Sequence, residues 1–254
     1  MNFAQYPSLV GRVVFVSGGA TGIGADLVAA FARNHARVGF IDVQREAGEA
    51  LARLLAGEGK APLFVEGDVT DIASLRGAIE RTRQHFGPIG VLVNNAANDQ
   101  RKGFAEIDPE FWDLSQNVNL RHHFFAAQAA HPQMKALGGG SIVNLSSIAW
   151  RAGAGEMPAY AAAKAGVVGL TRALARAFGP DNIRVNAIAP GAVMTPRQRE
   201  LWYKTEASVD AIVRRQMIRR VLDGAAIARA ALFLAADDSA MITKQTLTVD
   251  AGLR

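Results

Sequence analysis

Seven short apolar runs recur along this chain, and each is rich in valine and isoleucine. They lie near residues 13–16, 38–41, 62–65, 89–93, 141–145, 183–188 and 246–249. Runs that do not alternate with polar residues are typical of strands buried on both faces, and longer helical patterns lie between most of them. The pattern therefore predicts an α/β fold: a doubly wound parallel sheet of about seven strands with helices on both faces. No linker or repeat divides the chain, so we expect one domain over residues 1–254.

The first apolar run leads into a glycine-rich stretch from Ser17 to Gly24, and an alanine-rich stretch follows it. A strand, a glycine turn and a helix in this order suit the diphosphate of a dinucleotide. Glycines let the backbone approach the phosphates, and free amides at the start of the helix face their charge. The residues expected to cradle the diphosphate are Gly18, Thr21, Gly22, Ile23 and Gly24.

The second apolar run stops at Asp42, 18 residues after Gly24. A carboxylate at the end of the second strand can accept hydrogen bonds from a ribose diol, and it would repel a 2′-phosphate. This favours NAD over NADP. Arg45 follows three residues later and is either a phosphate-binding cation or a solvated helix residue. NADP therefore stays open as the alternative cofactor.

A serine, a tyrosine and a lysine suggest the chemistry. Tyr160 lies 13 residues after Ser147 and four before Lys164. A four-residue step on a helix places Tyr160 and Lys164 side by side, so the ammonium should lower the pKa of the phenol and make it a usable base. The Ser147 hydroxyl could hold the substrate oxygen while the proton moves. The alternative is an ordinary helix with a solvent-facing tyrosine and lysine.

Composition removes several other functions. The chain has no cysteine, which excludes disulfides and thiolate metal sites, and its two adjacent histidines, His122 and His123, have no metal-ligand spacing. The net charge of +5 comes from scattered arginines, which indicates a solvated face or attraction toward anionic cofactors rather than a nucleic-acid site. Neither a signal region nor an apolar run of about 20 residues is visible. We expect a cytoplasmic protein without membrane or metal partners.

Taken together, these motifs resemble the short-chain dehydrogenase/reductase family over nearly the whole chain. Further matches are Asn94 to Ala97, Asn119 and Pro190-Gly191. The departures are small: Ser17, Ala97 and Ala251 replace a usual threonine and two glycines. The resemblance implies a Rossmann fold, hydride transfer catalysed by Ser147, Tyr160 and Lys164, and a water relay supported by Asn119. It also implies cofactor contacts from Asp68, Val69, Asn95, Ala96, Tyr160, Lys164, Pro190, Gly191, Val193 and Thr195.

The stretch from about residue 195 to 220 is too long for a simple turn and is typical of a lid over an active site. It carries Arg197, Gln198, Trp202 and Tyr203. Hydrogen-bond donors beside aromatic faces suit a polyhydroxylated molecule, because hydroxyls need partners and the C–H face of a sugar packs on a ring. A surface helix that uses Trp202 only for packing is the alternative.

Several local motifs are similar to bacterial sugar dehydrogenases of this family, of the D-xylose 1-dehydrogenase type. They are residues 95–101, 119–122, 147–150 and 195–202. The resemblance implies NAD-dependent oxidation of an aldose at C1 to its lactone. A dehydrogenase of a secondary alcohol on a sugar acid, such as a 2-keto-3-deoxy sugar acid, is the runner-up. A dinucleotide-binding protein without activity is a remote alternative. The implied sugar-binding wall consists of Asp99, Arg101, Ser147, Trp150, Glu156, Tyr160, Arg197 and Trp202.

The resemblance also implies a homotetramer, joined through helices expected at 108–135 and 158–178 and through the C-terminal segments. Ala161, Ala165, Val168 and Ala175 form an alanine-rich helix face that would allow close contact between subunits. A face that packs inside one chain would have the same pattern.

Overall fold

The fold is that of a computed structural model, which describes residues 3–58 and 61–253. Seven parallel strands form one sheet in the order β3-β2-β1-β4-β5-β6-β7 within these residues. The strands are β1 (Val13–Ser17), β2 (Arg37–Asp42), β3 (Leu63–Glu66), β4 (Val91–Asn94), β5 (Gly140–Leu145), β6 (Ile183–Pro190) and β7 (Thr246–Val249). All seven apolar runs form strands, so the predicted fold class is confirmed.

The apolar runs become strands because both of their faces are covered. Every residue of β1 and β4 is buried, whereas β7, at one edge of the sheet, is only partly covered. β1 pairs with β2 on one side, with Val14 opposite Val38, and with β4 on the other, with Val14 opposite Val91. Burial on both faces removes alternation, which is why continuous runs marked these strands.

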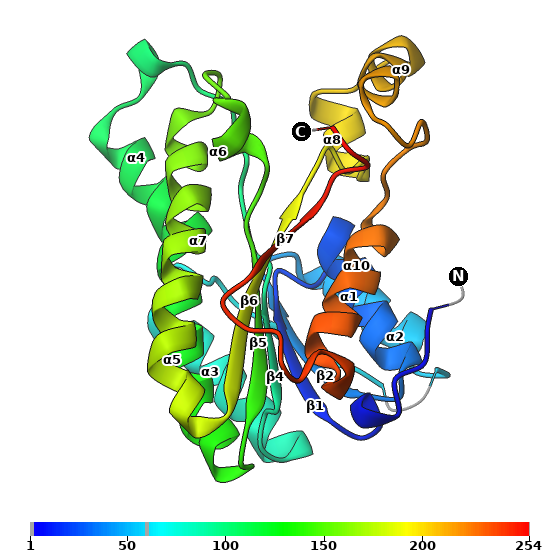
Figure 1. The fold of residues 1–254 in the computed structure, drawn as a ribbon, viewed down its shortest axis with the longest axis vertical. Coiled ribbons are helices and arrows are strands. Elements are labelled where there is room, and N and C mark those ends of the chain that lie inside the picture. The colour runs from blue at the N-terminus through cyan, green and yellow to red at the C-terminus, as the bar shows by residue number, and fades with distance from the viewer. Residues whose placement is uncertain (1–2, 59–60, 254) are drawn as a thin grey trace.

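Helices pack in two layers against the sheet (Figure 1). One layer holds α1 (Gly22–Arg33), α2 (Arg45–Leu55) and α10 (Gly224–Ala235), with α1 packed directly on α10. The other holds α3 (Ile72–Phe86), α5 (His122–Ala136) and α7 (Pro158–Phe178), preceded by the shorter α4 (Pro109–Gln116) and α6 (Ala149–Ala152). Each layer buries its own apolar cluster against one face of the sheet.

The two helices expected at 108–135 and 158–178 are both present. α7 spans Pro158–Phe178, beginning at a proline, whose missing amide costs nothing in a first turn. A π-helical segment, Asn117–Arg121, joins α4 directly to α5, so that the three form one helical stretch. Short π-helical insertions are frequent at functional sites. Ala175 of the predicted alanine-rich face is buried inside the chain, whereas Ala165 is exposed.

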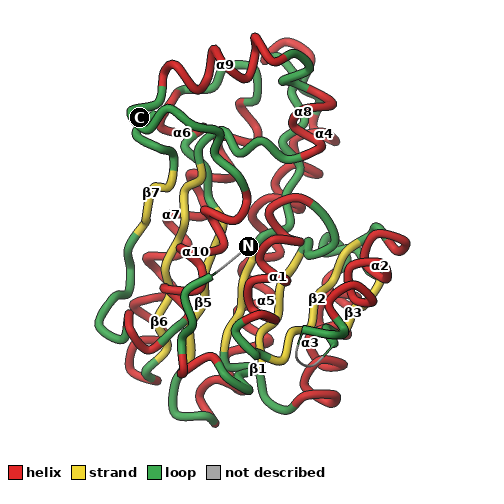
Figure 2. The backbone as a smooth tube through the Cα atoms, turned by 90° about the vertical axis from the view of Figure 1, so that its right-hand side faces the viewer, coloured by secondary structure: helices red, strands yellow, loops and turns green. Residues whose placement is uncertain are grey.

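The strand order reverses next to β1, between β2 on one side and β4 on the other. Such a reversal opens a crevice at the carboxyl ends of the strands, which is where ligands bind in sheets of this type. α8 (Pro196–Leu201) and α9 (Glu206–Arg215) lie beyond these ends (Figures 1 and 2). The fold thus places the segment predicted as a lid above the crevice. None of the described helices is long and apolar enough to cross a membrane.

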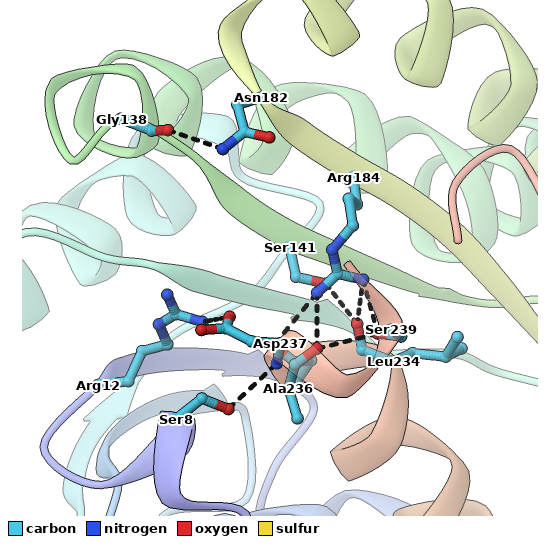
Figure 3. A network of polar contacts seen from close by, with 11 residues as sticks. Ser8, Arg12, Gly138, Ser141, Asn182, Arg184, Leu234, Ala236, Asp237 and Ser239 are labelled. Carbon is cyan, nitrogen blue, oxygen red and sulfur yellow. Dashed lines mark hydrogen bonds and ion pairs between the residues drawn. The ribbon is translucent and has the colours of Figure 1, made fainter. Parts of the chain in front are cut away.

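The opposite end of the sheet is held by arginines (Figure 3). Arg184 of β6 donates hydrogen bonds to the carbonyls of Leu234 (2.7 Å) and Ala236 (3.0 Å) at the end of α10. Arg12 pairs with Asp237 at 3.0 Å. The last carbonyls of a helix have no partner within the helix and carry partial negative charge, so these cations stabilise the end of α10. The positions of Arg12 and Arg184 are therefore explained by contacts that stabilise the fold.

Candidate active site

A cavity of about 730 Å³ opens at the carboxyl ends of the strands. Its wall is made by the glycine turn, by the ends of β2, β4, β5 and β6, and by the segment that contains α8 and α9. The structure brings every predicted cofactor residue to this wall. They are Gly18, Thr21, Gly22, Ile23, Gly24, Asp42, Asp68, Val69, Asn95, Ala96, Tyr160, Lys164, Pro190, Gly191, Val193 and Thr195.

The glycine turn is shaped so that side chains are excluded from it. Gly18 has a φ of +66°, and a Cβ atom there would lie 2.6 Å from the Cα of Ala96. A Cβ on Gly24 would lie 1.8 Å from the carbonyl oxygen of Gly18. The side chain of Thr21 does not cap α1, so the first amides of the helix are left to face the cavity. The turn fits the diphosphate of a dinucleotide.

Asp42 is held in place before any ligand binds. It is 8% exposed, and its two carboxylate oxygens accept hydrogen bonds from the amides of Ala20 (2.9 Å) and Gln44 (3.0 Å). Each oxygen keeps a lone pair for a hydroxyl. Arg45 is not aimed at this position, because its guanidinium lies 3.0 Å from Glu49 and 3.9 Å from Glu66. The residues present fit a ribose diol.

A buried histidine, which the sequence did not mark as functional, supports the nucleotide-binding loop. Its Nε2 atom lies 3.3 Å from the Ser17 hydroxyl, which accepts hydrogen bonds from the amides of Asn95 (3.0 Å) and Ala96 (3.2 Å). This residue is His122, and burial lowers its pKa to about 3. The imidazole is therefore neutral near pH 7 and helps to fix the loop without adding charge.

Ser147, Tyr160 and Lys164 meet at the cavity wall. Lys164 is 1% exposed, and its ammonium lies 5.7 Å from the centre of the Tyr160 ring. The same ammonium donates a hydrogen bond to the Leu145 carbonyl at 2.8 Å. The Ser147 hydroxyl accepts from the amide of Ala149 at 3.1 Å. The predicted side-by-side arrangement of Tyr160 and Lys164 is confirmed.

The protonation of this pair differs from the prediction. Burial raises the pKa of Tyr160, the nearby charge of Asp99 raises it further, and the hydrogen bond with Ser147 only partly opposes them. Burial lowers the pKa of Lys164 to about 7, although Asp99 works in the other direction. Desolvation disfavours the charged form of both groups. The sequence showed that the cation lies beside the phenol but could not show how dry the site is.

Asn119 lies in the π-helical segment and is fully buried. Its side chain accepts a hydrogen bond from the amide of Asn98 (2.9 Å) and donates to the Asn98 carbonyl (3.0 Å) and to the Ser115 carbonyl (2.9 Å). It is not part of the cavity wall, unlike the other predicted catalytic residues. In this structure the Asn119 side chain holds the loop after β4 in place. Its role in a water relay stays a prediction.

The predicted sugar-binding wall is brought together only in part. Asp99, Arg101, Glu156 and Arg197 line the cavity with Ser147 and Tyr160. Trp150 and Trp202 are not among the described residues that line it. The Arg101 guanidinium lies over the Trp202 ring, 4.2 Å from its centre, and Arg151 lies over Trp150 at 4.9 Å. The wall also contains residues that were not among the predicted substrate contacts, namely Leu114, Met157, Gln198, Tyr203, Ile212 and Arg215.

Comparison with known proteins places this geometry in a family. A model of the family described as enoyl-(acyl carrier protein) reductase matches residues 18–254. A solved short-chain dehydrogenase/reductase of Serratia marcescens, a double mutant, is 33% identical, with a TM-score of 0.89 over 97% of this chain and 99% of its own. The chain belongs to the short-chain dehydrogenase/reductase family. The members of this family are oxidoreductases that use nicotinamide cofactors, and the resemblance predicted from the motifs is confirmed.

Two relatives are more similar to this chain in sequence than the Serratia protein is, and a further solved structure is similar in fold. "Probable galactose dehydrogenase GalD" of Rhizobium meliloti is 47% identical over 98% of both chains. A D-xylose 1-dehydrogenase of Caulobacter vibrioides is 43% identical over the full length of both. A putative short-chain alcohol dehydrogenase of Sinorhizobium meliloti, solved by crystallography, has a TM-score of 0.91 at 32% identity, covering 97% of this chain and 98% of the other.

Proposed function

We propose that this protein oxidises a neutral aldose at C1 to its lactone, with NAD as the hydride acceptor. One observation carries the proposal: a single cavity holds the glycine turn, the fixed carboxylate of Asp42 and the pair of Tyr160 and Lys164. The first two suit a dinucleotide with a free ribose diol, and the pair suits removal of a proton from an alcohol. Hydride transfer from a carbinol needs both a bound dinucleotide and a group that accepts the proton of the alcohol.

The chain's own residues would handle the proton. NAD, when bound, takes the hydride from C1. The Tyr160 oxygen takes the proton of the anomeric hydroxyl, so that the C1–O bond becomes the carbonyl of the lactone and electrons and protons balance. The Ser147 hydroxyl, which lines the cavity beside Tyr160, donates a hydrogen bond to the reacting oxygen and orients it. Lys164 favours the deprotonated phenol and, as the family resemblance implies, holds the cofactor ribose.

The sugar substrate is supported by the relatives and by the wall. The two sugar dehydrogenases reported above match the chain from end to end at 43% and 47% identity. The wall carries polar side chains from the loop after β4 and from α8, together with the apolar surface of Met157 and Leu114. Convergent polar groups on a partly apolar wall suit a polyol.

A secondary alcohol on a sugar acid is the second candidate, and one feature favours it. Arg101 lines the cavity, and a guanidinium can bind a carboxylate with two hydrogen bonds. Arg197 is less suited to this role, because it donates to Asn98 at 3.0 Å and lies 3.7 Å from Asp99. A dinucleotide-binding protein without activity is the third candidate.

A screen of substrates separates these candidates. Aldoses, sugar acids and simple secondary alcohols are each supplied with NAD or NADP, and formation of the reduced cofactor is followed by absorbance. We expect turnover of aldoses with NAD, and mass spectrometry should detect the lactone before it hydrolyses. Tyr160→Phe should bind NAD as the unchanged protein does but lose nearly all turnover, because it lacks the proton acceptor. Preference for sugar acids would support the second candidate, and an inactive protein that binds NAD would support the third.

A further inference from the structure

Asp99 is a residue of the cavity wall whose carboxylate contacts two side chains of α8. It lies in the loop after β4, and its side chain is 21% exposed. From below, Asn119 fixes both the amide and the carbonyl of the preceding residue, Asn98. From above, Gln198 of α8 donates a hydrogen bond to one carboxylate oxygen, and the Arg197 guanidinium lies 3.7 Å from the other. Asn119 thus holds the backbone before Asp99, and α8 orients its carboxylate.

The charge of Asp99 is paired only in part by these contacts. Gln198 is neutral, and the guanidinium of Arg197 is half exposed and shared with the side chain of Asn98. The electrostatic effect of Asp99 reaches both reacting side chains, because it raises the pKa of Tyr160 and that of Lys164. A fixed negative charge thus lies beside the place where the substrate oxygen must bind.

We propose that Asp99 is a specificity-determining residue: it accepts a hydrogen bond from the substrate hydroxyl next to the reacting one, and it excludes substrates with an anionic group. The inference rests on the proposed function and narrows its substrate class to neutral polyhydroxylated molecules. A carboxylate that accepts from a hydroxyl forms a strong, charge-assisted hydrogen bond, whereas two carboxylates repel each other.

The lid takes part in this selection. Gln198 and Arg197 are on α8, so Asp99 has its observed orientation only while α8 lies over the cavity. Arg101, from the same loop as Asp99, stacks on Trp202 directly after α8 and strengthens the same closure. Gln198 and Arg197 are therefore positioning residues, which act on the substrate through Asp99.

The test compares three sugars that share the galactose ring and differ in one substituent each. D-Galactose is the reference, 2-deoxy-D-galactose lacks the hydroxyl next to C1, and D-galacturonate carries a carboxylate. The ratio kcat/KM is measured for each with the unchanged protein, with Asp99→Asn and with Asp99→Ala. Glu200→Gln, on the exposed side of α8, is the matched control for loss of one negative charge. The affinity for NAD, measured by titration, reports whether each variant keeps its cofactor site.

We expect the unchanged protein to prefer galactose to 2-deoxygalactose by about 10- to 100-fold, the range for a charge-assisted hydrogen bond. This preference should fall to within about threefold in Asp99→Ala, while Glu200→Gln keeps it. Galacturonate should be a poor substrate that improves at least tenfold, relative to galactose, in Asp99→Asn. KM for galactose should rise more than kcat falls, because the contact binds the substrate.

Two outcomes would overturn the inference. One is that Asp99→Ala, with normal affinity for NAD, still discriminates against the 2-deoxy sugar as the unchanged protein does. The other is that the unchanged protein prefers galacturonate, which would show that Arg101 governs the site. The first result leaves the proposed oxidation of a neutral aldose standing, whereas the second favours a sugar acid as the substrate. If the unchanged protein binds NAD but oxidises no aldose in the wider screen, the proposed function itself fails, whatever the variants do.

Discussion

At the scale of the residue, the pair of Tyr160 and Lys164 is described by the number of titratable protons on its two side chains. Below pH 7 the free protein keeps a protonated Tyr160 and a charged Lys164, so the pair holds two protons. Above pH 7 it loses one, because burial lowers the pKa of Lys164 to about 7. The pair then keeps one titratable proton, and only in this state can it accept another from a substrate.

This proton count predicts the pH dependence of the reaction. For oxidation, kcat/KM for NAD should rise about tenfold per pH unit below about pH 7 and level off above it, since this ratio reports groups of the free enzyme. Lys164→Met removes the group that titrates, so the rise should move to higher pH, where the buried phenol itself ionises. Initial rates from pH 5.5 to 10 would check this. An unchanged inflection in Lys164→Met would show that the pair does not control the rate.

Cofactor choice is also decided by single residues. Asp42→Ala removes a carboxylate that faces the ribose position, so kcat/KM for NAD should fall by about 10- to 100-fold, with a smaller loss for NADP because repulsion of its 2′-phosphate disappears. Asp42→Asn is the matched control, because it keeps the shape and one acceptor. Circular dichroism shows whether both variants keep the fold. A natural preference for NADP would contradict the role given to Asp42.

At the scale of the element, the sequence predicted well what depends on short-range patterns. The seven strands, α7 and the motifs at the strand ends follow from apolar runs, glycine turns and fixed spacing. The contacts of the lid do not follow from such short-range patterns. The sequence left open whether Trp202 packs on a sugar or only within a surface helix, and it did not indicate that the Arg101 guanidinium covers its ring. The periodicity of apolar residues predicts local elements and does not predict contacts between residues far apart in the sequence. For the same reason it did not predict the buried hydrogen bond between His122 and Ser17.

The stacking of Arg101 on Trp202 predicts a role for closure of the lid. Trp202→Ala leaves the loop after β4 without one of its contacts to the lid, and stacking of this kind contributes about 0.5–2 kcal/mol. We expect KM for the sugar to rise by about 3- to 10-fold with a smaller change in kcat, and trypsin to cleave faster after Arg197 and Arg199. Phe104→Ala, which removes an exposed aromatic ring from the same connection after β4, should change neither. Equal rates of cleavage in both variants would contradict the closure.

At the scale of the whole molecule, the helix layer of α4, α5 and α7 exposes several small and aromatic residues on the described surface. Ala162, Ala165, Gly169 and Ala173 are exposed at helical spacing on α7. Trp112 of α4 and Phe124 of α5, two helices that pack on α7, are about 40% exposed. A row of small residues lets another helix approach closely, and aromatic side chains next to it supply apolar area to bury. The pattern fits the helix-mediated contact between subunits that the family resemblance implies.

The assembly prediction follows from this surface. Light scattering at micromolar concentration should give about four times the chain mass of 27.0 kDa. Ala165→Arg places a long charged side chain in the middle of the row on α7, so it should block close approach and give dimers or monomers that keep their circular dichroism. Ala56→Arg, exposed directly after α2 in the other helix layer, is the control and should keep the mass of the unchanged protein. A monomeric unchanged protein, or a tetramer that tolerates Ala165→Arg, would show that this face is not the interface.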